Sequence, residues 1–243
     1  MIRTWNTQAQ NYAQLADSKI DDAVEYEINV PSILKLCPKS ANNVLDLGCG
    51  NGVLISSLKK IYKNIDACDG AATMIAIAKQ NHPNLEFFTL DLENKFNLKK
   101  HYDLIICKMV LMFVKNIKKV ATECIGTLNK SGHLIVSVPH PFYWTSYYLQ
   151  NKYKVKDCPE FAVMSKGYFS EVPISKSLGR NKELVFEYIH RTFSTYINAF
   201  ASEGFVVDKI DEPTITPKFI SKNPNYAKKF DIPMRLNIRF KKV

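Results

Sequence analysis

The strongest constraint on the fold is an alternation of short apolar runs and amphipathic segments over residues 41–139. Within residues 117–128, apolar side chains recur at steps of three and four, as they do in an amphipathic helix. Near-continuous apolar strands joined by helices are typical of a parallel sheet that is covered on both faces. We therefore predict an α/β fold with a doubly wound, mostly parallel sheet. The predicted strands are 43–47, 65–68, 85–90, 102–107, 134–138, 205–210 and 234–240.

Four segments are expected along the chain. Residues 1–40 are predicted to form an N-terminal helical lid, and residues 41–139 the ligand-binding core. Residues 140–190 are aromatic and irregular, and we interpret them as an inserted cap over the substrate site. Residues 191–243 then supply the last helix and the closing strands of the core.

Composition excludes several classes of protein. The 243 residues are 46% hydrophobic, and no apolar run reaches the roughly 18 residues of a membrane span, so no membrane partner is expected. Six cysteines form no CxxC pair, which predicts reduced thiols, no metal site and a cytoplasmic location. The net charge of +10 lies mostly in the second half, which leaves a nucleic-acid partner possible but not favoured. The sequence does not indicate an oligomeric state.

A glycine-rich turn follows the first predicted strand and reads Asp46-Leu47-Gly48-Cys49-Gly50-Asn51-Gly52. In open parallel sheets, ligands bind outside the carboxyl ends of the strands. The spacing is G-x-G-x-G, whereas the dinucleotide fingerprint G-x-G-x-x-G would need a glycine at Val53. An acid beside this loop suits a ligand with a cationic group better than a pyrophosphate.

Two more carboxylates end neighbouring predicted strands. Asp69 follows the second strand, where a carboxylate can accept hydrogen bonds from a ribose diol. Asp91 follows the third strand and could accept from an adenine amino group, although an aspartate there also suits a turn or a helix N-cap. With the glycine loop, these acids predict a site for an adenosyl group without phosphate.

This set of motifs resembles the class I S-adenosylmethionine-dependent methyltransferases. Residues 44–52 are similar to the first motif of that family, residues 69–75 to its ribose-binding motif, and Asp91-Leu92 to its adenine-binding motif. Residues 109–112, 137–142 and 190–196 further resemble bacterial small-molecule methyltransferases of this class. The resemblance implies a Rossmann-like sheet of seven strands with an antiparallel last strand, and S-adenosyl-L-methionine as the cofactor.

The resemblance also implies roles for individual residues. Met74 would pack on the adenine, and the N-terminal Trp5, Tyr12 and Tyr26 would fold over the cofactor. The backbone carbonyl of Lys108 would meet the cofactor's amino group, with the Lys108 side chain turned away from the sulfonium. The cofactor-binding residues expected in total are Tyr12, Tyr26, Asp46, Gly48, Cys49, Gly50, Asp69, Gly70, Met74, Asp91, Leu92 and Lys108.

In-line attack on a sulfonium methyl needs orientation and exclusion of water more than acid catalysis. His140, directly after the fifth strand, and His190, before the last helix, are the candidate catalytic residues, although either could equally be a turn or surface residue. Histidines 82, 101 and 133 are expected to be exposed. We predict a methyltransferase acting on an oxygen or nitrogen of a small molecule.

Other functions stay open on the sequence. An RNA-modifying methyltransferase could use the basic second half, and a non-catalytic S-adenosylmethionine-binding protein could keep the same core. The Asn/Asp-Pro-Pro-Tyr/Phe motif of N6 enzymes is absent after the fourth strand, where Cys107-Lys108-Met109-Val110 stands. A nicotinamide oxidoreductase is disfavoured by Val53.

Overall fold

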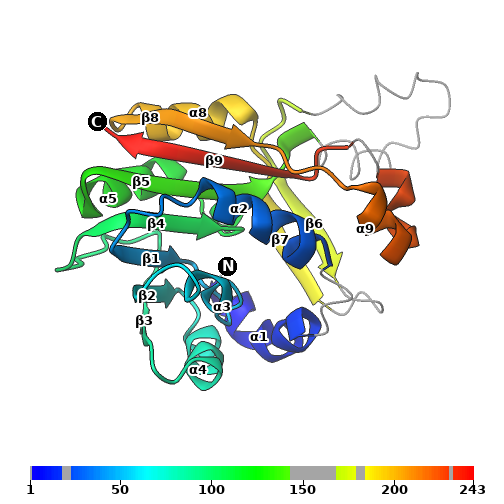
Figure 1. Cartoon of the computed structure of the whole chain (residues 1–243), viewed down its shortest axis with the longest axis horizontal. Coiled ribbons are helices and arrows are strands. Elements are labelled where there is room, and N and C mark those ends of the chain that lie inside the picture. Colours follow the sequence, from blue (N-terminus) through cyan, green and yellow to red (C-terminus); the bar gives the residue numbers. More distant parts are fainter. Residues whose placement is uncertain (1, 18–22, 143–167, 179–183, 230–231) are drawn as a thin grey trace.

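A computed structural model describes residues 2–17, 23–142, 168–178, 184–229 and 232–243. Its centre is a seven-stranded sheet in the order β3-β2-β1-β4-β5-β9-β8 (Figure 1). The strands span Asn43–Leu47 (β1), Asn64–Asp69 (β2), Glu86–Thr89 (β3), Tyr102–Lys108 (β4), Leu128–Pro139 (β5), Phe205–Asp211 (β8) and Arg235–Lys242 (β9). The first five pair in parallel, whereas β9 pairs antiparallel with both β5 and β8.

Helices cover both faces of this sheet (Figure 1). Side chains of β4 point alternately to the two faces, because successive residues of a strand face opposite ways. Leu104 and Ile106 pack into one apolar cluster, and Ile105 and Cys107 into the other, and all four are fully buried. One cluster includes residues from α2 (Val30–Leu36), α3 (Ile55–Leu58) and α4 (Ala72–Asn81), and the other from α5 (Ile117–Thr127) and α8 (Phe193–Ala201).

The N-terminal segment consists of α1 (Ile2–Asp17) and the π-helical turn η1 (Glu25–Asn29), which leads directly into α2. In the described part of the 140–190 insertion, β6 (Pro173–Leu178) and β7 (Leu184–Ile189) form a two-stranded antiparallel sheet. Three shorter elements complete the chain: η2 (Leu111–Phe113), α9 (Pro217–Lys222) and η3 (Pro224–Lys229). Residues 143–167 of the predicted cap lie outside the described residues.

The predicted fold class is confirmed, and two local predictions are wrong. The helix expected from Val53 to Tyr62 is regular only over α3, where it is flanked by turns. We expected residues 129–132 to stop the preceding helix as a loop, but β5 already begins at Leu128. Its pairing with β4 shifts register between Tyr102 and Leu104, so the extra residues form an irregularity within the ladder.

No helix in the described ranges combines the length and the apolar character that crossing a bilayer requires. The five cysteines within those ranges are free, buried thiols. Cys158 lies outside them.

Candidate functional site

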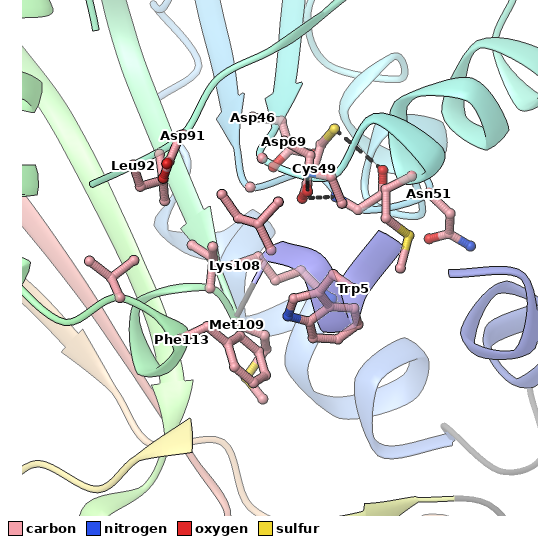
Figure 2. A pocket seen from close by; sticks show the side chains of 18 of the residues that line it. Trp5, Asp46, Cys49, Asn51, Asp69, Asp91, Leu92, Lys108, Met109 and Phe113 are labelled. Carbon is pink, nitrogen blue, oxygen red and sulfur yellow. Dashed lines mark hydrogen bonds between the residues drawn. The ribbon is translucent and has the colours of Figure 1, made fainter. Parts of the chain in front are cut away.

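A cavity of about 530 Å³ opens at the carboxyl ends of β1, β2 and β4 (Figure 2). Its volume falls within the usual range for small-molecule sites. Parallel strands end at the same edge of a sheet, so residues far apart in the chain meet here. The predicted cofactor residues found in its wall are Tyr12, Asp46, Gly48, Cys49, Gly50, Asp69, Gly70, Met74, Asp91, Leu92 and Lys108.

Glycine is required in the loop after β1 for two different reasons. Gly48, Gly50 and Gly52 all have positive φ angles, of 81°, 56° and 84°. Residues other than glycine rarely adopt such angles. A Cβ on Gly48 would lie 2.4 Å from Cγ2 of Val110, so the loop packs closely on the segment after β4. A Cβ on Gly50 would meet no described atom within 4 Å. The loop therefore leaves its backbone at Gly50 open to a ligand.

Hydrogen bonds from two sides fix this loop. The Cys68 carbonyl of β2 accepts from the backbone N–H groups of Gly48, at 2.8 Å, and Cys49, at 2.9 Å. At the end of α4, Nε2 of His82 lies 2.9 Å from the Gly52 carbonyl oxygen. The expectation that His82 is merely exposed is wrong, because its ring packs against the loop and stacks on Phe87.

Asp69 lies next to the loop and orders it. Its Oδ2 accepts from the Gly50 N–H at 2.9 Å and its Oδ1 from the Ala71 N–H at 2.8 Å. Burial raises the pKa of this carboxyl, and these two N–H groups oppose the rise. Each carboxylate oxygen can accept a second hydrogen bond, so Asp69 keeps the capacity to receive ligand hydroxyls.

Asp91 follows β3 and forms a turn as well as part of the wall. Its Oδ1 accepts from the Glu93 N–H at 3.0 Å and its Oδ2 from the Asn94 side-chain amide at 3.1 Å. The turn proposed as the alternative interpretation is therefore present. It does not remove Asp91 or the neighbouring Leu92 from the cavity wall.

Asp46 is the most unusual carboxylate of the site. The residue is 1% exposed, and neither carboxylate oxygen has a hydrogen-bond partner among the described residues. Burial raises the pKa of this carboxyl to about 7, opposed by the Lys108 ammonium and reinforced by the charge of Asp69. Buried polar groups in native proteins are almost always paired, so an unpaired carboxylate facing a cavity suits a ligand that donates hydrogen bonds.

Aromatic side chains border the cavity on its other side. Trp5 of α1 stacks on Phe186 of β7 with ring centroids 4.2 Å apart and meets Tyr12 and Phe113 edge-on at 5.2 and 5.0 Å. Trp5, Tyr12 and Phe113 belong to the wall, and Figure 2 shows Trp5 and Phe113 there. The N-terminal helix α1 and strand β7 therefore contact each other at the edge of the cavity.

Arg191 holds the segment after β4 in place. Its guanidinium is buried and donates to the carbonyl oxygens of Leu111 at 3.1 Å, Val114 at 2.5 Å and Lys115 at 3.0 Å. The same segment contributes Val110 and Phe113 to the cavity wall. The sequence alone does not indicate this role of Arg191, because its partners lie about eighty residues away in the chain.

The two candidate catalytic histidines are not among the described residues of the cavity wall. His140 Nε2 lies 2.6 Å from Glu212 Oε1, and its Nδ1 accepts from the Phe142 N–H, so both ring nitrogens are engaged. His190 Nε2 bonds the Tyr168 carbonyl at 2.8 Å. Burial lowers the pKa of both imidazoles. Their catalytic roles stay predictions.

Tyr26 of η1 is also not among the described wall residues, so the structure does not bring it to the other predicted cofactor residues. Conversely, Ile2, Asn51, Val110 and Phe113 line the cavity without having been selected from the sequence. Asn51, Val110 and Phe113 follow strand ends on the ligand side, and that position is the signal that could have identified them. Ile2 carries no such signal, because only packing places it against Gly70.

The arrangement has a definite chemical preference. The wall has four acidic residues, Asp46, Asp69, Asp91 and Glu93, and three basic ones, Arg3, Lys108 and Lys115. The three aspartates lie at the carboxyl ends of β1, β2 and β3, where they favour hydroxyl, amino or cationic groups over a pyrophosphate. Apolar residues, including Met74 and Leu92, supply a surface for a flat ring. Such a site fits a nucleoside that carries an amino group and no phosphate.

A family model described as a methyltransferase domain matches residues 16–168. The chain belongs to this family. It is 28% identical over 139 residues to malonyl-[acyl-carrier protein] O-methyltransferase of Bacillus anthracis, covering 56% of this chain and 51% of that protein. The match thus spans about half the length of that relative.

Solved structures share the fold over most of the chain. An S-adenosylmethionine-dependent methyltransferase from Mesorhizobium loti superimposes with a TM-score of 0.68 at 21% identity, covering 87% of this chain and 96% of that one. The N-methyltransferase NodS from Bradyrhizobium japonicum, solved with S-adenosyl-L-homocysteine, gives a TM-score of 0.56 at 14% identity, with 88% and 85% covered. The fold is that of the class I methyltransferases.

Proposed function

We propose that this protein transfers a methyl group from S-adenosyl-L-methionine to an oxygen or nitrogen of a small molecule. The observation that carries the proposal is the buried carboxylate of Asp46 in the wall of the cavity, which has no hydrogen-bond partner in the described part of the chain. A ligand that binds here must donate hydrogen bonds or bring positive charge. The α-ammonium group of the cofactor meets both needs.

The rest of the cofactor matches the other wall residues. Asp69 would accept from the ribose hydroxyls, and the open backbone at Gly50 gives the ligand room to approach. Asp91 would accept from the adenine amino group, with Met74 and Leu92 on the ring faces. The absence of a phosphate from this ligand agrees with the three aspartates at the strand ends.

The cofactor supplies an electrophilic methyl group whose leaving group, a thioether, is neutral. The protein's work is therefore to orient the acceptor for in-line attack and to keep water out. The aromatic contacts of Trp5 with Phe113 and Phe186 support a covering role for α1 and the hairpin. Residues 1–40 and 140–190 are accordingly proposed as the lid and cap.

An oxygen or nitrogen acceptor is supported by the O- and N-methyltransferases that the chain is similar to. His140 would serve as a base for such an acceptor only after releasing Glu212 or the Phe142 N–H, because both ring nitrogens are engaged. Replacing His140 with alanine tests this role, which unchanged turnover of a methyl acceptor would remove.

Calorimetric titration with S-adenosylmethionine, S-adenosylhomocysteine and NAD tests the proposal. We expect micromolar or tighter binding of the first two and none of NAD. Gly50→Arg fills the open space in the loop and should abolish binding, whereas Gly126→Arg should not. Gly126 is the matched control, because a Cβ there also meets no described atom within 4 Å, but on the exposed surface of α5. NAD binding, or normal cofactor binding by Gly50→Arg, would overturn the assignment.

A further inference from the structure

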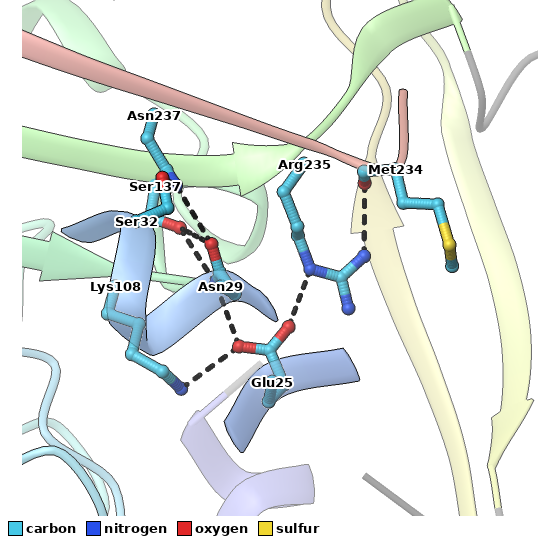
Figure 3. Close-up of polar contacts among 8 residues, drawn as sticks. All are labelled: Glu25, Asn29, Ser32, Lys108, Ser137, Met234, Arg235 and Asn237. Carbon is cyan, nitrogen blue, oxygen red and sulfur yellow. Dashed lines mark hydrogen bonds and ion pairs between the residues drawn. The ribbon is translucent and has the colours of Figure 1, made fainter. Parts of the chain in front are cut away.

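A buried cluster of charges includes Lys108 of the cavity wall and is not accounted for by the roles above (Figure 3). Glu25 of η1 is 5% exposed, and its Oε1 accepts from Nε of Arg235 at 2.5 Å. Its Oε2 lies 3.4 Å from Nζ of Lys108. Burial alone would raise the pKa of Glu25, but the charges of Arg235 and Lys108 lower it to about 2. Glu25 is therefore ionised at neutral pH.

Neutral hydrogen bonds hold Glu25 in this position. Asn29 donates to Oε2 of Glu25 at 2.8 Å and to Oγ of Ser137 on β5 at 3.1 Å. Asn237 of β9 donates to Oδ1 of Asn29 at 3.0 Å and to Oγ of Ser32 at 2.7 Å. The N-terminal segment is thereby fixed to the carboxyl end of β5 and to β9, and the carboxylate of Glu25 has a defined place.

Lys108 connects this cluster to the ligand site. It belongs to the cavity wall, and its charge acts on Asp46 as well as on Glu25. Figure 3 shows its ammonium turned toward Glu25. An ammonium group in the wall would repel a sulfonium cation in the same cavity, because like charges at partly buried sites are weakly screened.

We propose that Glu25 is a charge-compensating residue of the cofactor site, which offsets the Lys108 ammonium so that the cavity accepts the cationic sulfonium and not only the neutral thioether. This inference rests on the proposed function. It assigns to a residue of the N-terminal segment a role in discriminating S-adenosylmethionine from S-adenosylhomocysteine. The two ligands differ at the sulfur by one methyl group and one positive charge.

The proposal predicts a change in the ratio of the dissociation constants of S-adenosylmethionine and S-adenosylhomocysteine. A purely structural role of Glu25 would not change this ratio. Two unit charges about 10 Å apart at an effective dielectric constant of about 20 change an affinity roughly tenfold. Glu25→Gln should therefore weaken binding of S-adenosylmethionine about tenfold more than binding of S-adenosylhomocysteine. Lys108→Met should shift the ratio in the opposite direction by a similar factor. The double variant removes one charge of each sign, and its ratio should return to that of the wild type.

The experiment measures both dissociation constants by calorimetry for the wild type, the two single variants and the double variant. Losing one partner of a buried ion pair is strongly destabilising, so thermal unfolding is used to show which variants are folded. If Glu25→Gln does not fold, Lys108→Met is compared with the double variant, since these two differ only in the charge of residue 25. Lys108→Met keeps the pair of Glu25 and Arg235 and provides an independent arm.

Opposite shifts of the ratio in the two single variants support the proposal. Equal loss of affinity for both ligands in Glu25→Gln, or an unchanged ratio in Lys108→Met, overturns it and leaves Glu25 a purely structural residue. Failure of the proposed function is separate and visible in the wild type, which would then bind neither ligand.

Discussion

The Asp46 carboxylate should make the ligand-free protein less stable as pH rises. Burial raises its folded-state pKa to about 7, against an ordinary value of 3.8. An acid with a raised pKa in the folded state keeps its proton there while the unfolded chain has lost it. The loss of unfolding free energy that the buried Asp46 causes is therefore absent below pH 4, grows as pH rises toward 7, and is constant above that. Asp46→Asn removes this titration.

The size of this change in unfolding free energy follows from the change in the pKa of Asp46. Each pKa unit corresponds to about 1.4 kcal/mol, so between pH 5 and pH 7 the unfolding free energy of Asp46→Asn should gain about 2–3 kcal/mol relative to the wild type. The buried amide carries a cost of its own, but that cost does not vary with pH. The same substitution should weaken S-adenosylmethionine binding, because the ammonium loses its carboxylate.

Urea unfolding at pH 5, 6, 7 and 8 without ligand measures this difference. Asp103→Asn is the control, because backbone N–H groups and Asn129 lower the pKa of Asp103 against the effect of burial. Because the pKa of Asp103 is lowered, this residue does not titrate between pH 5 and pH 8. The difference in unfolding free energy between Asp103→Asn and the wild type should therefore stay constant over that range. A difference between Asp46→Asn and the wild type that is equally flat would refute the reasoning about Asp46.

Three further predictions concern stability and are measured by urea unfolding. Gly50→Ala should cost about 1–2 kcal/mol for its left-handed backbone, whereas Gly48→Ala should cost about 2–5 kcal/mol because its Cβ also collides with Val110; equal losses would contradict the packing argument. Arg191→Lys should cost about 2–4 kcal/mol, since an ammonium cannot reproduce the forked contacts to three carbonyl groups, and wild-type stability would show those contacts to be unimportant. Tyr102→Phe should cost about 1 kcal/mol, because Asp66 loses its 2.9 Å bond to the hydroxyl but keeps Lys100; a loss above about 3 kcal/mol would mean that the hydroxyl does more than this bond.

The pattern of apolar and polar residues along the chain was enough to predict the sheet and the side of the cavity that the strand ends form. Apolar runs identify strands buried on both faces, and the carboxyl ends of parallel strands necessarily meet at one edge. Asp46, Asp69 and Asp91 end three such strands, so their convergence followed from the order of elements. The glycine spacing after Asp46 disfavoured a dinucleotide loop for the same local reason, because each glycine determines the backbone conformation only of its own turn.

The other side of the site depends on contacts between distant segments. Trp5 stacks on Phe186, and Glu25 meets Arg235 across 210 positions of the chain. Periodicity cannot encode such pairs, because it reports which face of an element is buried and not what covers it. For the same reason His82 was expected to be exposed, although α4 ends against the glycine loop.

The sequence by itself determined the class of fold, the loop that approaches the ligand and the acids at the strand ends, since each depends on residues close together in the chain. Only the tertiary structure decided that Asp46 has no hydrogen-bond partner among the described residues, that His140 is paired with Glu212, and that Lys108 of the cavity wall contacts Glu25. These properties are burial, pairing and charge compensation. They arise when separate elements pack together and exclude water, and no single segment carries them.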